Sequence, residues 1–353
     1  MATQKDILFT CSYLPEEIVA AAGFRLARVV ARARPSDADT AIHPTTCPYI
    51  RAVFAAAARG DWSGAAGVVI VNSCDGMRRL YDALGALAAG PRVTFLDVPG
   101  KRDADAVELF AADLGRFARR LEEDFGGTRV TPSALERAIT KKNALRRKMT
   151  DVFAMQADGG ISGSAVFSLL IDAAGGNEHE VSERIEGLTA VPGWGVDANA
   201  GKRIVVSANL LDRPDLVLMI EGAGGSVVAL DTCVGVRHYE GLVEEGSPDP
   251  IYAIARRYLT RPPCPRMDGI GDRIDWLVKL AEASRADGVV LTTLKYCDSW
   301  LYDQPLLTEH LQGAGMGVLT LENDYEWSGL GQMRTRIEAF LETLRQGGKK
   351  CLK

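Results

Sequence analysis

Short apolar runs alternate with longer amphipathic stretches along most of this chain. The runs Val68 to Val71 and Val289 to Leu291 are bounded by turn-type residues, which predicts buried strands at 67–72 and 288–292. The same pattern predicts strands at 92–98, 203–207, 226–230 and 317–321. Helical patterns lie between the strands, at 15–33 and 49–59 and in DPIYAIARRYL, RIDWLVKLAEASR and TRIEAFLETLRQ. Strands that alternate with helices indicate an α/β fold with parallel sheets.

Helical patterns alone fill the middle of the chain. Thr131 and Pro132 are placed like an N-cap and a first-turn proline before SALERAITKKNALRRKMTDVFAM, and strand patterns are absent up to about residue 190. We therefore predict an N-terminal α/β lobe at 1–130, a helical connector at 131–200 and a C-terminal α/β lobe at 201–353.

One phrase occurs twice. GVVIVNSCDGMRRLYDAL begins at residue 67 and GVVLTTLKYCDSWLYDQPLL at residue 288, and each brings Cys-Asp to the end of a predicted strand. Leu80-Tyr81-Asp82 also matches Leu301-Tyr302-Asp303. An ancient duplication of one lobe is the simplest hypothesis for this repetition.

The composition is that of an ordinary globular protein. Of the 353 residues 47% are hydrophobic and 25% are charged, so the chain has enough apolar residues for two or three domains. The net charge of −5 gives no general reason to bind nucleic acid or an anionic membrane. No apolar run approaches the roughly 18 residues of a membrane span, and we expect a cytoplasmic protein. The basic run KKNALRRK (141–148) is interpreted as a solvated helix face, with an acidic partner or a CoA phosphate as the alternative.

Seven cysteines are spread through the chain, and disulfides are disfavoured in a reducing cytosol. Six of them stand at loop or strand-end positions, namely Cys11, Cys47, Cys74, Cys233, Cys264 and Cys297. None forms a CxxC pair, so the pattern is unlike a zinc finger. Widely spaced thiolates from two lobes suit an iron–sulfur cluster, whereas the alternative is a set of buried packing cysteines. Cys351 is interpreted as incidental.

Other chemical signals are weaker. GAGG at 222–225 follows a helix and precedes a strand, which is typical of a helix-ending turn. No P-loop pattern and no GxSxG elbow occur in the sequence. His43 and His238 lie near predicted cluster cysteines, and Glu322 and Asp324 follow a strand, where they could act as acid or base or could cap a helix. We take Glu322 and His43 as the acid–base candidates.

The motifs together resemble the D-component family of 2-hydroxyacyl-CoA dehydratases, which also includes benzoyl-CoA reductase subunits and double-cubane cluster proteins. The resemblance covers nearly the whole chain and rests on CSYLPEEIVAAAG, TCPYIRA, VNSCDGMRRLYD, DTCVGVR, DPIYAIARRYLTRPPCPRMD, KYCDSWLYDQP and LENDYEWSGLGQMRTRIEAF. It implies two Rossmann-like lobes that hold an oxygen-sensitive iron–sulfur cluster. It also implies that Cys47, Cys74 and Cys297 bind a [4Fe–4S] cluster, with Cys11, Cys233 and Cys264 lining or completing it.

The resemblance further implies a reaction and partners. A low-potential electron from a separate ATP-hydrolysing iron–sulfur activator reaches the thioester carbonyl of a CoA substrate, and the resulting radical expels the 2-hydroxyl group. We expect a homodimer or a heterodimer with a similar subunit, and no nucleic acid or membrane partner. Six thiolates also resemble the double-cubane [8Fe–9S] reductases of small molecules. RPPCPRMDG and KYCDSW depart from that branch, and a non-catalytic cluster-carrying subunit is the third possibility.

Overall fold

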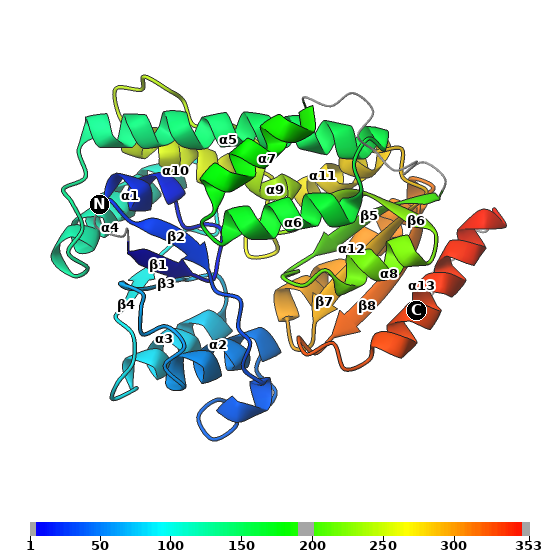
Figure 1. Cartoon of the computed structure of the whole chain (residues 1–353), viewed down its shortest axis with the longest axis horizontal. Coiled ribbons are helices and arrows are strands. Elements are labelled where there is room, and N and C mark those ends of the chain that lie inside the picture. Colours follow the sequence, from blue (N-terminus) through cyan, green and yellow to red (C-terminus); the bar gives the residue numbers. More distant parts are fainter. Residues whose placement is uncertain (1–4, 190–200, 348–353) are drawn as a thin grey trace. The chain divides into compact units, whose positions relative to one another are not determined.

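Within residues 5–189 and 201–347, which the computed structural model describes, eight strands form two parallel sheets of four strands each (Figure 1). The first sheet has the order β2-β1-β3-β4 and consists of β1 (Asp6–Phe9), β2 (Arg25–Arg28), β3 (Gly67–Val71) and β4 (Val93–Leu96). The second has the order β6-β5-β7-β8 and consists of β5 (Lys202–Ala208), β6 (Gly225–Asp231), β7 (Gly288–Leu294) and β8 (Gly317–Asn323). The α/β class with two Rossmann-like lobes is thus confirmed, and the equal strand order supports the duplication hypothesis.

The chain divides into two compact units, each assembled from separate segments. The first consists of Met1–Arg146, Ala174–Gly176 and Gly241–Asp268, and the second of Arg147–Ala173, Asn177–Glu240 and Gly269–Lys353. Three helices connect the two sheets along the sequence, α5 (Pro132–Asp158), α6 (Gly163–Ala174) and α7 (Glu178–Thr189). The predicted start of the first of them is correct, because the Thr131 hydroxyl accepts a hydrogen bond from the Ala134 N–H. The three-part division at 130 and 200 stays a prediction.

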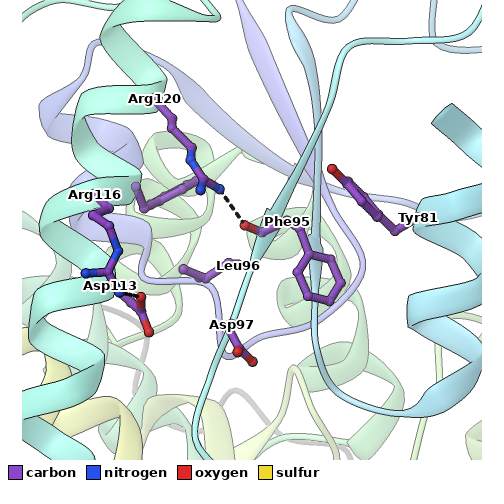
Figure 2. Close-up of a pocket in the computed structure, with 8 residues that line it drawn as sticks. Tyr81, Phe95, Leu96, Asp97, Asp113, Arg116 and Arg120 are labelled. Carbon is purple, nitrogen blue, oxygen red and sulfur yellow. Dashed lines mark hydrogen bonds and ion pairs between the residues drawn. The ribbon is translucent and has the colours of Figure 1, made fainter.

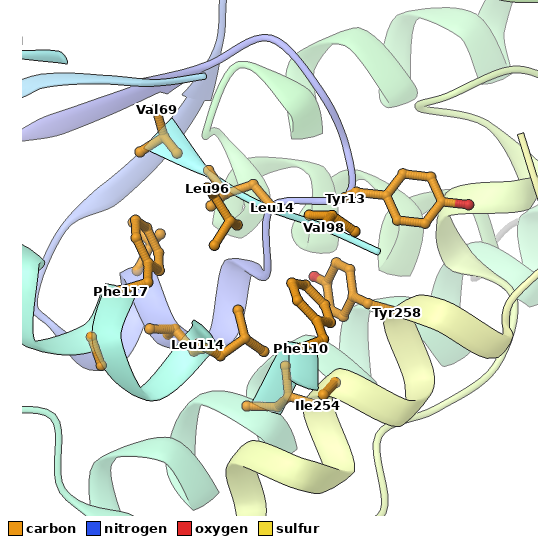
Figure 3. Close-up of a cluster of buried hydrophobic side chains, with 14 of the residues drawn as sticks. Tyr13, Leu14, Val69, Leu96, Val98, Phe110, Leu114, Phe117, Ile254 and Tyr258 are labelled. Atoms are coloured by element: carbon orange, nitrogen blue, oxygen red, sulfur yellow. The ribbon is translucent and has the colours of Figure 1, made fainter. Parts of the chain in front are cut away.

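The core of the first unit lies on one face of its sheet. Side chains of β1 and β3 pack there against α1 (Glu16–Ala21), α4 (Ala104–Glu123) and α10 (Pro250–Thr260). Figure 3 shows Phe110 of α4 beside Tyr258 of α10, with Leu114 and Phe117 farther along α4. The alternate side chains of β3 point to the other face, where α2 (Pro48–Ala58) and α3 (Asp75–Gly85) lie after the short η1 (Pro35–Ala38) (Figure 1).

The second unit has helices on both faces of its sheet. On one face α11 (Ile270–Ala283) and α12 (Asp298–Gly313) bury apolar side chains against β5, β6 and β7. On the other face lie α8 (Asp215–Gly222) and α13 (Leu330–Arg345), and Phe340 would stand 2.7 Å from a Cβ placed on Gly288. The short α9 (Val236–Tyr239) follows β6. The GAGG turn is confirmed, since α8 ends at Gly222 and Gly224 has a φ of 79°.

Two predictions from the sequence are wrong. The helix expected at 15–33 stops at Ala21, because Gly23 adopts a left-handed φ of 87° and the following residues pair with β1 as strand β2. The basic run 141–148 is not one solvated face. Lys142 and Arg146 are buried and form ion pairs with Glu16 and Glu17 at 3.3 and 2.5 Å.

In the described part of the chain, no helix combines the length and the apolar character that crossing a membrane requires.

Candidate metal centre

The three cysteines that are the predicted [4Fe–4S] ligands each stand at the start of a helix. Cys47 is the N-cap residue of α2, Cys74 that of α3 and Cys297 that of α12. N-caps are usually Ser, Thr, Asp or Asn, so helix capping does not account for cysteine at three such places. The positive end of a helix favours a thiolate, which is the form that binds metals. Each of these helix starts therefore favours a metal-binding thiolate.

In the first unit α2 and α3 pack closely at the ends that carry Cys47 and Cys74. A Cβ on Gly76 would lie 2.4 Å from the Ile50 Cδ1 atom and 3.8 Å from the Cys74 Sγ atom. Glycine at position 76 thus allows Ile50, one turn into α2, to approach the first turn of α3. The contact brings the two helix N-termini, and with them two of the three predicted ligands, to one region of the unit.

Cys11 and Cys264 also belong to this unit, and Tyr13 connects the loops that carry them. The Tyr13 hydroxyl accepts a hydrogen bond from the Cys264 N–H at 3.4 Å. The guanidinium carbons of Arg261 and Arg266 lie 4.3 and 5.0 Å from the centroid of the Tyr13 ring. Burial and the nearby Cys264 thiol raise the pKa of Tyr13 to about 12, although Arg261 and Arg266 lower it. The hydroxyl therefore stays protonated near neutral pH.

Arg266 extends this connection to the ends of β3 and β4. Its guanidinium donates hydrogen bonds to the carbonyl oxygens of Asn72 and Val98 at 2.9 and 2.7 Å. Asn72 precedes Cys74 by two residues. The loops of Cys11, Cys74 and Cys264 therefore all lie at the carboxyl edge of the first sheet, where α/β proteins usually bind ligands.

The second unit carries the remaining two of the six candidate cysteines, also at the carboxyl edge of its sheet. Cys233 follows β6 and Cys297 follows β7. Close packing shapes the turn after Cys233, because a Cβ on Gly235 would lie 2.0 Å from the Leu230 carbonyl oxygen. Before Cys297, Tyr296 adopts a left-handed φ of 60°, a strained conformation for an aromatic residue that is typical of functional loops.

All six thiols have some solvent exposure. Cys74 is exposed and the other five are half-buried, whereas packing cysteines are among the most fully buried residues. Thiolates with this exposure fit the donor chemistry of an iron–sulfur cluster. Among the described residues no three His, Cys, Asp or Glu side chains gather closely enough to hold a metal ion, so the ligand set stays a prediction. Cys351 lies outside the described residues.

The acid–base candidates occupy exposed positions in different units. His43 precedes α2, and its Nδ1 atom lies 3.3 Å from the Thr45 backbone nitrogen and 2.8 Å from the Thr45 hydroxyl oxygen. Glu322 is exposed on β8. Asp324 instead accepts hydrogen bonds from the Ser328 hydroxyl and N–H at 2.6 and 3.2 Å. Burial raises the pKa of Asp324, but these bonds outweigh it and the pKa falls below its usual value, so Asp324 is a poor general base. His238 is buried at α9.

A pocket of about 290 Å³ beside β4 was not found from the sequence (Figure 2). Tyr81 of α3 contacts Phe95 with ring centroids 5.0 Å apart, and Arg120 of α4 donates to the Phe95 carbonyl oxygen at 3.1 Å. Arg116 pairs with Asp113 on the same wall. Arginines at this helical spacing look like any solvated helix face, so no local signal marks the pocket.

Comparisons with known proteins match one family along nearly the whole chain. The model of the family "2-hydroxyglutaryl-CoA dehydratase, D-component" matches residues 11–344. The chain is 25% identical over 345 residues to an (R)-phenyllactyl-CoA dehydratase beta subunit of Clostridium sporogenes, covering 97% of this chain and 92% of that protein. It is 24% identical over 349 residues to a lactoyl-CoA dehydratase subunit beta of Anaerotignum propionicum, covering 94% and 90%.

Proposed function

Because this chain belongs to the 2-hydroxyglutaryl-CoA dehydratase D-component family, we propose that it is the iron–sulfur component of a 2-hydroxyacyl-CoA dehydratase. The observation that carries the proposal is the family match together with cysteine at three helix N-caps. Cys47, Cys74 and Cys297 would hold the cluster, and Cys11, Cys233 and Cys264 would line or complete it. When bound, the cluster supplies a low-potential electron to the thioester carbonyl of the substrate.

The chain's own residues would bind the cluster, fix the loops that carry its ligands and supply an acid and a base. The helix N-termini at Cys47, Cys74 and Cys297 favour the thiolate form that binds a cluster. Tyr13 and Arg266 fix the loops around Cys11, Cys74 and Cys264. Glu322 and His43 are the proposed acid–base residues, and their exposure allows proton exchange with solvent.

The proposal includes two protein partners. Both relatives described above are named as beta subunits, so a second, unlike subunit is proposed for this chain as well. An ATP-hydrolysing iron–sulfur activator is proposed as the source of the electron.

A double-cubane reductase is the second candidate. It needs six thiolates, and the observation in its favour is that all six cysteines have some exposure at loop or helix-start positions. The iron content per chain separates it from a dehydratase with a single cluster.

The test of function is an anaerobic assay with the second subunit, the activator, ATP, a reductant and a panel of 2-hydroxyacyl-CoA esters. We expect formation of an enoyl-CoA, detected by liquid chromatography and mass spectrometry, and its loss in Cys47→Ser, Cys74→Ser and Cys297→Ser variants. Cys351→Ser is the matched control and should retain activity. Full activity of the three variants would contradict the proposal, and so would no turnover of any ester.

A further inference from the structure

Trp300 occupies the first turn of α12, three residues after Cys297. Its backbone N–H donates a hydrogen bond to the Cys297 carbonyl oxygen at 3.1 Å, and its side chain is 1% exposed. The guanidinium carbons of Arg237 and Arg273 lie over the indole, 5.5 and 4.9 Å from the ring centroid. In the part of the chain that the structure describes, the buried indole Nε1 atom has no hydrogen-bond partner. The ring is therefore held by packing and by the two cations.

Both arginines are themselves buried and held by carboxylates. Arg237 forms an ion pair with Asp231 at 2.7 Å and donates to the Ala208 carbonyl oxygen at 2.8 Å. Arg273 forms an ion pair with Asp303 of α12 at 2.6 Å. The two cations are thus fixed from β6 and from α12 itself.

Asp231 gathers further elements of the same unit around this point. It accepts hydrogen bonds from the Ser207 hydroxyl at 2.5 Å and from the Trp276 Nε1 atom of α11 at 3.0 Å. Strands β5 and β6 and helices α9, α11 and α12 therefore converge on the Trp300 side chain. The three partners of Asp231 hold this buried carboxylate, and Arg237 with it, in one arrangement.

We infer that Trp300 is a positioning residue that fixes the start of α12 and thereby the orientation of Cys297. Cys297 caps a helix whose first turn is held in place through the indole, so movement of the indole moves the cap. This effect on the thiol is independent of the cluster. The consequence of this orientation for the reaction rests on the proposed function, in which Cys297 is a cluster ligand.

The two repeats differ at this position. Met77 stands three residues after Cys74, where Trp300 stands after Cys297. Met77 is also buried, and it donates its N–H to the Cys74 carbonyl oxygen at 3.1 Å. Position 77 therefore provides a matched control with the same helix geometry and without the indole.

The test compares Trp300→Leu, Trp300→Phe and Met77→Leu in the 353-residue chain after a chelator has removed any iron, so that no metal protects either thiol. The readout is the ratio of the alkylation rates of Cys297 and Cys74 by iodoacetamide, measured on their peptides by mass spectrometry. The reaction is run at about pH 9, where most thiols are ionised and access decides the rate. We expect the ratio to rise roughly tenfold in Trp300→Leu, the factor that corresponds to 1.4 kcal/mol.

Trp300→Phe should restore the ratio, since a phenyl ring keeps the contact with the cations and no indole hydrogen bond is lost. Met77→Leu should not raise it. An unchanged or lower ratio in Trp300→Leu would overturn the inference, as would an equal rise in Trp300→Phe.

If Trp300→Leu does not fold, Arg273→Met is measured instead, and its ratio must rise for the inference to stand. The alkylation ratio does not require an active enzyme. A rise of the alkylation ratio in Trp300→Leu would uphold this inference even if the anaerobically purified chain carried no iron. The missing iron would then contradict the proposed function alone.

Discussion

The Tyr13 hydroxyl accepts a hydrogen bond from the Cys264 N–H, although the two residues are 251 positions apart in the sequence. The same tyrosine ring lies under the guanidinium groups of Arg261 and Arg266. One side chain thus joins the loop after β1 to the loop after α10, and both loops carry predicted cluster cysteines.

Tyr13→Phe should destabilise the protein by about 1 kcal/mol, because it removes the acceptor for the Cys264 N–H and keeps the ring under the arginines. Tyr13→Leu, which also removes the ring, should cost about 3 kcal/mol. Urea unfolding of both variants measures the difference. Equal losses would show that the hydrogen bond, rather than the ring, dominates this contact.

Glu17→Gln should be more damaging. Glu17 is fully buried, forms an ion pair with Arg146 at 2.5 Å and accepts a hydrogen bond from the Tyr258 hydroxyl at 3.0 Å. Neutralising it leaves Arg146 buried without its carboxylate, which typically costs about 3–5 kcal/mol. Glu16→Gln should cost less, because the Glu16 side chain keeps some exposure and its ion pair with Lys142 is longer, at 3.3 Å. Similar unfolding free energies for the two variants would contradict the buried pair's role.

The same carboxylate predicts how stability depends on pH. Burial raises the pKa of Glu17, but Arg146 and then Arg257 lower it more, so its folded pKa lies below the ordinary value of 4.5. The unfolded chain then binds the proton more tightly, and the stabilisation is complete above the ordinary pKa and is lost as the pH falls through the folded one. Between about pH 5 and about pH 3 the free energy of unfolding, measured in urea, should fall as the pH falls, and it should fall less steeply in Glu17→Gln than in the wild type. Equal slopes in the wild type and in Glu17→Gln would show that Glu17 is not the source of this pH dependence.

Two glycines should respond differently to alanine. At Gly235 the new Cβ would lie 2.0 Å from the Leu230 backbone oxygen, which cannot move aside, and we expect a loss of about 3 kcal/mol. At Gly76 it would meet only the end of the Ile50 side chain, and we expect a loss within about 1 kcal/mol.

Ile50→Val should reduce the loss of stability caused by Gly76→Ala and should not change the loss caused by Gly235→Ala. A double-mutant cycle of unfolding free energies, measured in urea, tests this. Additive effects of Gly76→Ala and Ile50→Val would refute the contact between α2 and α3.

Local patterns predicted six of the eight strands in the described part of the chain. Strands β3 and β7 are short runs of β-branched and apolar residues before a cysteine, and periodicity alone marks them. Strand β2 was missed, because Leu26, Val29 and Val30 have helical spacing and only pairing with β1 makes the segment extended.

The site was predictable in part for the same reason. Cys47, Cys74 and Cys297 could be placed at helix starts from their neighbours in the sequence. The contact between Tyr13 and Cys264 and the cations over Trp300 join distant segments, and no local spacing predicts them. The burial of Arg146 was missed likewise, since its partner Glu17 lies on another helix.

We propose that Cys47, Cys74 and Cys297 bind one iron–sulfur cluster. The most direct measurement is the iron and acid-labile sulfide content of the anaerobically purified chain, with EPR after dithionite reduction. It is made on the wild type, on Cys74→Ala and Cys297→Ala, and on a variant with Cys11, Cys233 and Cys264 all changed to alanine.

We expect about four irons per chain, unchanged in the triple variant and lost in Cys74→Ala and Cys297→Ala. About eight irons that fall sharply in the triple variant would contradict the single-cluster account and indicate a double-cubane reductase. No iron in the wild type, or full iron content in both single variants, would contradict the metal centre itself.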